Sequence, residues 1–252
     1  MLKQWRRRRT LARHTIPDAL WTRTLAETAS LATLDDQSLQ RLREFALLFL
    51  FEKSLEAGAD FELDDAKRVR IAALACRPIL ELGLDSYAGF VSIVVHPDEF
   101  VVAGREQEDE DGVVHVGDDV LSGEAWEQGP VVLAWGEVLA SGRGDGFDVV
   151  AHEFAHKLDL LDGVANGMPP LHQDMSEAAW IETFQSAFDD LHVRIERGEE
   201  PWLDPYAAED PAEFFAVCSE MFFDVPTAFA AEYPAVYAQL ARFYRQDPAA
   251  AG

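Results

Sequence analysis

The spacing of apolar residues divides the chain into three parts. Before residue 86, apolar side chains recur every three or four positions, which is the period of a helix that buries one face. This pattern predicts three helices, over residues 16–25, 36–50 and 64–83. Pro78 can kink the third of them, because proline cannot donate a helical hydrogen bond.

From Phe90 the pattern changes to short runs of β-branched residues, which are typical of strands. The runs at 91–96, 100–102, 113–116 and 131–135 predict a small mixed sheet, with the acidic segment 106–111 as a solvated loop. Proline is tolerated better at the edge of a sheet than in its middle. Pro130 therefore makes residues 131–135 the candidate edge strand.

Helical spacing returns after residue 148. Residues of the kinds that cap helices predict helices that begin after Asp148, Ser176 and Asp210, and a last helix that begins near Pro234. The expected fold class is α+β, a mainly helical single domain with a small mixed sheet. We expect a basic tail at 1–15 and one domain at 16–252, helical over 16–85 and with the sheet and the candidate site over 86–252.

The segment 151–159 carries the pattern H-E-x-x-H. Residues four apart lie on one face of a helix, so His152 and His156 can bind one metal ion with Glu153 beside it. This is the spacing of zinc metallopeptidases, in which the glutamate takes a proton from water. A histidine pair can also be hydrogen-bonded in a core. However, burying these polar groups on an apolar helix is costly unless they are paired or ligated. The pattern favours one zinc ion per chain and makes Glu153 the candidate catalytic base.

A catalytic zinc ion has three protein ligands, and spacing leaves three carboxylates as candidates for the third. Asp159 shares a helix face with His156, but its side chain is short and better placed to orient a ligand histidine or to end the helix. Glu213 and Glu220 lie on one face of a later, apolar helix, where acidic residues are unusual. Glu213 can instead complete a cap with Asp210, and Glu220 can be exposed or can orient a ligand histidine. Spacing alone does not choose between them.

Two blocks of sequence, GFDVVAHEFAHKLDLLDG at 146–163 and DPYAAEDPAEFFAVCSEMFF at 204–223, together resemble the zinc-dependent peptidases of the Mlc titration factor A family. The resemblance covers nearly the whole chain. That family is similar in its active site to the catalytic domain of anthrax lethal factor, within the gluzincin group. The resemblance implies a peptide or protein substrate. It also implies that the zinc ligands are His152, His156 and Glu213, with Glu220 behind a ligand. In such a site Glu153 is the base, and Tyr206 stabilises the oxyanion.

The chain of 252 residues has a formal charge of −25, although its first ten residues include Lys3 and the run Arg6–Arg9. So acidic a body repels nucleic-acid phosphates, and the basic start is expected to be a solvated tail. No apolar run approaches a membrane span, and two cysteines in apolar surroundings fit a cytoplasmic protein. Family members are linked to a transcriptional repressor of glucose uptake. A binding protein that sequesters a transcriptional regulator is therefore the alternative to a peptidase. A structural zinc site closed by Asp159 is a third reading.

Overall fold

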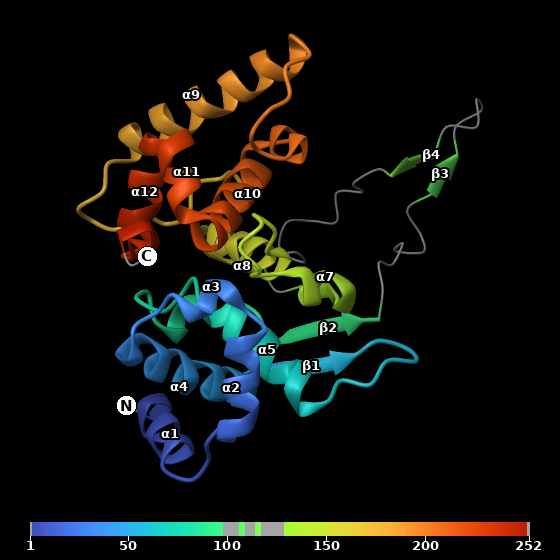
Figure 1. Ribbon diagram of the computed structural model, residues 1–252, viewed down its shortest axis with the longest axis vertical. Coiled ribbons are helices and arrows are strands. Elements are labelled where there is room, and N and C mark those ends of the chain that lie inside the picture. The colour runs from blue at the N-terminus through green and yellow to red at the C-terminus, as the bar shows by residue number, and fades with distance from the viewer. Residues whose placement is uncertain (1, 98–105, 109–113, 117–128, 251–252) are drawn as a thin grey trace.

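The structure is a computed structural model that describes residues 2–97, 106–108, 114–116 and 129–250. Its mainly helical α+β architecture confirms the expected fold class. Two groups of helices lie on either side of helix α8 (Val149–Asp159), with a small sheet beside the N-terminal group (Figure 1). No helix in these described ranges combines the length and the apolar character needed to cross a membrane.

The N-terminal group begins with a helix where a solvated tail was predicted. The elements of this group are α1 (Leu2–Leu11), α2 (Asp18–Ala26), α3 (Ala29–Ala32), α4 (Asp36–Glu52), β1 (Ser54–Ala57), α5 (Asp65–Cys76) and the short 3₁₀ helix η1 (Leu84–Tyr87). The tail prediction was wrong because two of its cations have acidic partners: Arg7 pairs with Glu52, and Lys3 pairs with Asp85. Helix α5 also ends earlier than predicted, two residues before Pro78.

The main sheet has three strands in the order β1–β2–β5, with β2 at Ser92–His96 and β5 at Val131–Ala134. Both pairings are parallel, so the sheet is not mixed as expected. Strand β5 pairs with β2 alone among the described residues, which agrees with its prediction as an edge, but Trp135 already begins a helix. An antiparallel pair, β3 (Glu106–Glu108) and β4 (Val114–Val116), includes residues predicted as loop. The predicted strand at 100–102 lies outside the described residues.

The C-terminal group supplies the rest of the molecule. Its elements, from the end of β5 onwards, are α7 (Trp135–Ala140), α8, η2 (Leu160–Asp162), α9 (Glu177–Glu196), η3 (Pro205–Ala208), α10 (Pro211–Asp224), α11 (Pro226–Glu232), α12 (Pro234–Tyr244) and η4 (Pro248–Ala250). The predicted caps of α9 and α10 are confirmed, since Ser176 accepts a hydrogen bond from the nitrogen of Ala179 and Asp210 accepts one from the nitrogen of Ala212. Helix α11 was not predicted.

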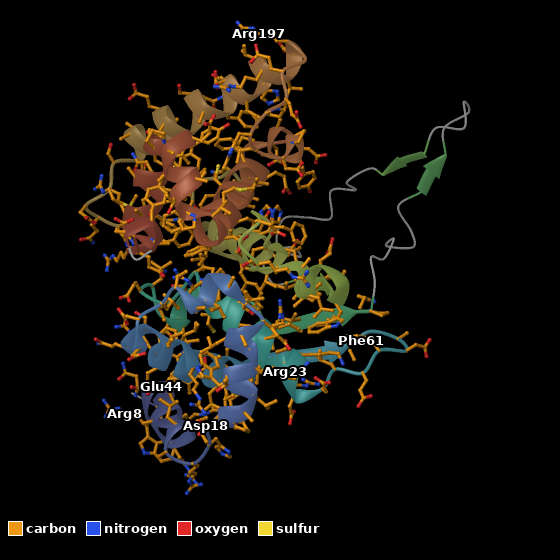
Figure 2. The ribbon with its side chains drawn as sticks, in the orientation of Figure 1. Arg8, Asp18, Arg23, Glu44, Phe61 and Arg197 are labelled. Carbon is orange, nitrogen blue, oxygen red and sulfur yellow. The ribbon has the colours of Figure 1, made fainter. Side chains whose placement is uncertain are left out.

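Helix α8 belongs to the cores of both groups. The ring of Phe154 packs against Phe49, Tyr87 and Phe90, with ring centroids 5.0–5.7 Å apart. On its other side α8 packs against α10. Charged side chains cover the outside of the molecule, where Arg8 on α1 and Arg197 after α9 lie at opposite ends (Figure 2). The apolar packing on both sides fixes the position of α8 and of the polar residues it carries.

Candidate metal centre

Helix α8 holds the two histidines of the H-E-x-x-H pattern on one face. The carboxylate of Asp148 caps the helix by accepting a hydrogen bond from the nitrogen of Ala151 at 3.0 Å. One turn along the helix, the Nε2 atoms of His152 and His156 lie 3.1 Å apart. His152 is buried and His156 is partly buried. The two ring nitrogens therefore converge on one point beside the helix.

Glu213 reaches this point from α10. Pro211 occupies the first turn of α10, and Asp210 accepts hydrogen bonds from the nitrogens of Ala212 and Glu213 at its start. The Glu213 carboxylate faces α8, with Oε2 3.0 Å from Nε2 of His152 and Oε1 3.4 Å from Nε2 of His156. Among the described residues, these three side chains form the one group of histidine, cysteine or acidic residues with the spacing of a metal site.

The spacing of these donor atoms fits a metal ion. A tetrahedral ion about 2.0–2.1 Å from its ligands holds them about 3.3 Å apart, close to the 3.0–3.4 Å observed. Oε2 of Glu213 is buried and, apart from its 3.0 Å contact with Nε2 of His152, has no hydrogen-bond partner among the described residues. Such an atom normally destabilises a fold unless a charge or a donor compensates it. A cation between the three side chains would supply that compensation.

Protons compete with a metal ion for this site. Hydrogen bonds to Glu213 and Glu220 outweigh the effect of burial and raise the pKa of His152 to about 10. Burial opposes ionisation of Glu213, but the hydrogen bonds of the two histidines lower its pKa below the ordinary value. A metal ion binds neutral imidazole, so it would replace the proton on His152. The donor set is thus a carboxylate and two imidazoles held in place before any ion arrives.

Glu220 lies behind His152 on the side away from Glu213. Its Oε1 is 2.7 Å from Nδ1 of His152, and its Oε2 accepts a hydrogen bond from the backbone nitrogen of Asp148 at 2.9 Å. The side chain is buried. A proton on Nδ1 that is donated to Glu220 leaves the lone pair of Nε2 directed at the candidate metal position. Of the two readings that spacing left open for Glu220, the geometry is that of a residue that orients a ligand.

Asp159 does not contact the histidines through any hydrogen bond in the described chain. Its Oδ2 instead accepts hydrogen bonds from the nitrogens of Asn166 and Gly167, at 2.9 and 2.8 Å. Burial raises its pKa to about 6, although those two hydrogen bonds act in the opposite direction. Asp159 therefore holds the segment that follows α8, and neither orients a ligand histidine nor belongs to the three-residue group.

Glu153 and Tyr206 lie beside the donor atoms. Glu153 is partly buried next to His152, and burial raises its pKa despite the opposing influence of the histidines. Tyr206 in η3 has its ring centroid 6.1 Å from that of His152. Burial, and then the carboxylates of Glu213 and Glu209, raise the pKa of Tyr206, so its hydroxyl stays protonated. Glu153 can thus accept a proton, and the hydroxyl of Tyr206 can donate a hydrogen bond.

A groove of about 740 Å³ opens beside these residues. His152, Glu153 and Tyr206 line it together with apolar side chains and further carboxylates, and no lysine or arginine of the described residues contributes to the lining. The lining acids outside the candidate site are Glu137, Asp145, Glu200 and Asp204, and the larger apolar residues are Phe147, Trp202, Val217 and Met221. We call this space the α8 groove. Its charge favours cationic molecules.

Two supports of the site were missed from the sequence. Asp224 accepts hydrogen bonds from the nitrogens of Gly144 and Gly146 at 2.7–3.1 Å, which shapes the turn that enters α8. Its place one turn after Glu220 on an apolar helix was a signal for it. Gly167 lies against α10, where an added Cβ would be 2.2 Å from the carbonyl oxygen of Pro211. No local pattern marks that contact.

Comparison with known proteins gives consistent matches over the chain. A family model described as glucose-regulated metallopeptidase M90 matches residues 2–245. Mlc titration factor A from Enterobacter sp. is 42% identical over 241 residues, covering 93% of this chain and 89% of that protein. Proteins of the same name from Salmonella agona and Cronobacter sakazakii are 43% and 39% identical, over 86% and 97% of this chain and 83% and 91% of their own lengths.

Proposed function

The chain belongs to the M90 family of glucose-regulated metallopeptidases, and from that premise we propose that it is a zinc-dependent peptidase with its catalytic centre on α8. The observation that carries the proposal is the convergence of the donor atoms of His152, His156 and Glu213 beside an open groove. A structural site closed by a fourth protein ligand is disfavoured, because Asp159 is bonded to the backbone of residues 166 and 167.

Zinc is the proposed ion because two imidazoles and one carboxylate form a ligand set found in catalytic zinc sites of peptidases. When bound, such an ion lowers the pKa of a coordinated water molecule and polarises a peptide carbonyl. The three protein donors would leave a position open towards the α8 groove. One ion per chain is expected, and its identity is part of the proposal.

Glu153 is proposed as the general base. Burial raises its pKa, and a base whose pKa is nearer to neutrality accepts a proton from water more readily and can then release it to the leaving amine. Tyr206 is proposed to donate its hydroxyl proton as a hydrogen bond to the oxyanion that forms on the peptide carbonyl. The carboxylate of Glu220 keeps Nδ1 of His152 protonated, so that Nε2 remains the ligand atom.

The α8 groove indicates which peptides fit. Its lining includes Glu137, Asp145, Glu200 and Asp204 besides the acids of the candidate site, while Phe147 and Trp202 offer exposed apolar area. A peptide with basic or neutral residues would enter more easily than an acidic one, because like charges repel in a partly enclosed groove. A cytoplasmic location is proposed as well, since both cysteines are buried free thiols.

The test is peptide hydrolysis by the zinc-loaded protein and by Glu153→Gln. A panel of lysine-rich, neutral and glutamate-rich peptides is assayed by mass spectrometry, which also separates cleavage at the N-terminus from internal cleavage. We expect Glu153→Gln to lose at least 100-fold in turnover because the base is absent, while metal analysis still finds about one zinc per chain. Full activity of the variant would contradict the mechanism.

A second function is favoured by one observation, the name of the similar proteins from Enterobacter sp. and Cronobacter sakazakii, Mlc titration factor A, which refers to titration of Mlc. We propose as the alternative that the chain binds a transcriptional regulator and that proteolysis is weak or secondary. The Glu153→Gln variant separates the two functions. If binding to a regulator persists in this variant and after chelation, the binding function does not depend on the metal centre.

A further inference from the structure

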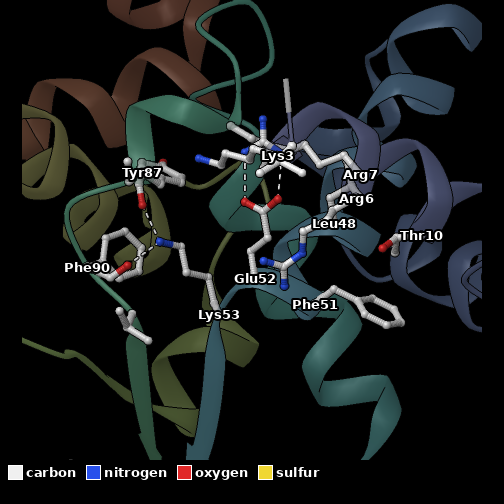
Figure 3. Close-up of a pocket in the computed structure, with 14 residues that line it drawn as sticks. Lys3, Arg6, Arg7, Thr10, Leu48, Phe51, Glu52, Lys53, Tyr87 and Phe90 are labelled. Carbon is white, nitrogen blue, oxygen red and sulfur yellow. Dashed lines mark hydrogen bonds and ion pairs between the residues drawn. The ribbon is translucent and has the colours of Figure 1, made fainter.

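A second pocket lies between α1 and the segment that leads into β2 (Figure 3). Its lining residues all precede β2 in the sequence, whereas those of the α8 groove all follow β5. The volume of this second pocket is about 560 Å³, which is in the range of about 300–1,000 Å³ typical of small-molecule sites. Helix α1 contributes one wall, the end of α4 another, and residues 84–91 the third. We call this space the α1 pocket.

The α1 pocket is cationic in a protein of net charge −25. Lys3, Arg6, Arg7 and Lys53 line it, and Glu52 is the one acidic residue that the described part of the chain adds to the lining. Asp85 lies just outside and also pairs with Lys3 and Arg7, at 2.6 and 2.9 Å. Four positive charges therefore face two negative ones. The pocket has the opposite charge to the molecule as a whole.

Two of the four cations, Arg6 and Lys53, are not needed to hold α1 in place. Arg7 and Lys3 bind α1 to the body through Glu52 and Asp85. The guanidinium of Arg6, in contrast, has no hydrogen bond or ion pair among the described residues. The Nζ atom of Lys53 donates to the carbonyl oxygens of Tyr87 and Phe90, and no carboxylate in the described part of the chain lies within ion-pair distance of it.

The environment of Lys53 supports an anionic occupant. Its Nζ lies 3.8 Å from the ring centroid of Phe90. Burial lowers the pKa of Lys53 to about 8, with Glu52 acting in the opposite direction. An ammonium with a depressed pKa gains more from a nearby anion than an exposed lysine does, because the anion restores the interaction lost on burial. Apolar side chains of Leu48, Phe51 and Phe90 complete the lining.

We propose that the α1 pocket binds a small organic phosphate, with its phosphate at Arg6 and Lys53 and its apolar body against Phe51 and Leu48. A phosphate dianion matches this pocket because it carries enough charge for two cations that have no carboxylate partner among the described residues, and because arginine binds its oxygens through paired N–H groups. The proposal does not depend on peptidase activity.

An occupant of the α1 pocket would contact aromatic residues that pack against the metal-site helix. Tyr87 and Phe90 line the pocket, and both pack against Phe154. Phe154 lies on α8 between His152 and His156. A ligand that fixes Tyr87 and Phe90 would therefore fix side chains in contact with the helix that carries two of the three metal donors.

The test is isothermal titration calorimetry of the purified zinc-loaded protein with phenyl phosphate. Inorganic phosphate tests the anion without the apolar body, and benzyl alcohol tests an apolar body without the anion. Arg6→Ala is compared with Arg8→Ala, a matched control on the same helix, exposed and outside the lining. We expect Arg6→Ala to weaken phenyl phosphate binding at least tenfold, Arg8→Ala less than twofold, and inorganic phosphate to bind more weakly than phenyl phosphate.

Phosphate groups can also bind a zinc ion, so Glu213→Ala provides the second control. We expect this variant to retain phenyl phosphate binding within about twofold if the α1 pocket is the site. Loss of binding in Glu213→Ala would overturn the proposal, because it would place the anion at the metal centre. So would absence of saturable binding, a loss below threefold in Arg6→Ala, or equal losses in the two arginine variants.

Discussion

The carboxylate of Glu220 lies 2.7 Å from Nδ1 of His152, although 68 positions separate the two residues. The same carboxylate accepts a hydrogen bond from the nitrogen of Asp148, the cap of α8. One side chain thus orients a candidate ligand and also holds the start of the helix that carries it. Helix α10 therefore contributes one donor to the candidate metal site and fixes the orientation of another.

Replacing Glu220 by Ala should lower zinc affinity by about 10–100-fold, because the ring of His152 loses the partner that fixes its tautomer. Affinity is measured by competition with a chromophoric chelator. Glu220→Gln is the matched control, since it keeps the shape and one acceptor and should lose less. Equal affinity in wild type and Glu220→Ala would show that His152 is oriented by other contacts.

Replacing Tyr206 by Phe should reduce turnover by about 100-fold, the usual effect of removing one oxyanion donor, with zinc content unchanged. The ring is more than a third exposed, so the loss of its hydroxyl should leave the unfolding temperature nearly the same. Steady-state kinetics on the best peptide of the panel provides the measurement. A rise in KM with constant turnover would reassign Tyr206 to substrate binding.

Asp148 should make the metal-free protein less stable at high pH. Burial raises its folded-state pKa to about 7, above the unfolded value. The folded state therefore retains the proton in the interval between the two values, and the stabilisation present at low pH is lost as pH rises towards 7. This group alone should lower the free energy of unfolding by up to about 3 kcal/mol between pH 5 and pH 8.

The measurement is urea unfolding in chelator at both pH values. Asp148→Asn keeps a capping side chain that stays neutral, so its stability should change less between pH 5 and pH 8 than that of wild type. Asp35→Asn is the control. A hydrogen bond from Ser38 lowers the pKa of that exposed cap, so the titration of Asp35 changes stability only at pH values below about 4, outside the measured interval. Identical pH dependence in wild type and Asp148→Asn would contradict the prediction.

Replacing Gly167 by Ala should destabilise the fold and weaken metal binding together. The φ angle of Gly167 is +74°, and an added Cβ would collide with the carbonyl oxygen of Pro211 at the start of α10. Relief of that contact displaces the turn that carries Glu213. Gly198→Ala is the matched control, because it has a φ of +69° with open space around it.

Both glycine variants carry backbone strain on the order of 1–2 kcal/mol. We expect the unfolding free energy of Gly167→Ala to fall by at least about 1 kcal/mol more than that of Gly198→Ala. Zinc affinity should fall in Gly167→Ala alone. Equal stability of the two variants would mean that Pro211 moves aside without consequence.

Local sequence signals predicted the parts of the fold that depend on local chemistry. The caps at Asp148, Ser176 and Asp210 were found because each side chain bonds to the backbone within three residues. Strand β1 was missed because its sequence, SLEA, lacks β-branched residues and becomes a strand only by pairing with β2. Its conformation comes from a partner 38 positions away, which no local pattern reveals.

The candidate site was predicted as far as a single helix could show it. The four-residue spacing of His152 and His156 indicates a shared ligand, because helix geometry fixes it. The choice between Glu213 and Glu220 needed the packing of α10 on α8, and only the family resemblance pointed to one of them. Between the two roles predicted for Asp159, orienting a ligand histidine and ending the helix, the sequence could not choose, because its partners, the nitrogens of 166 and 167, lie in an irregular segment.

The donors of the candidate site come from helices joined by the long stretch between residues 159 and 211, which includes α9 and η3. An ion that binds all three would act as a removable cross-link that closes this stretch into a loop and disfavours the unfolded chain. Its removal would increase the fraction of time the chain is open to proteolysis. At a given rate of synthesis, the amount of this protein in a cell would then follow the supply of its metal.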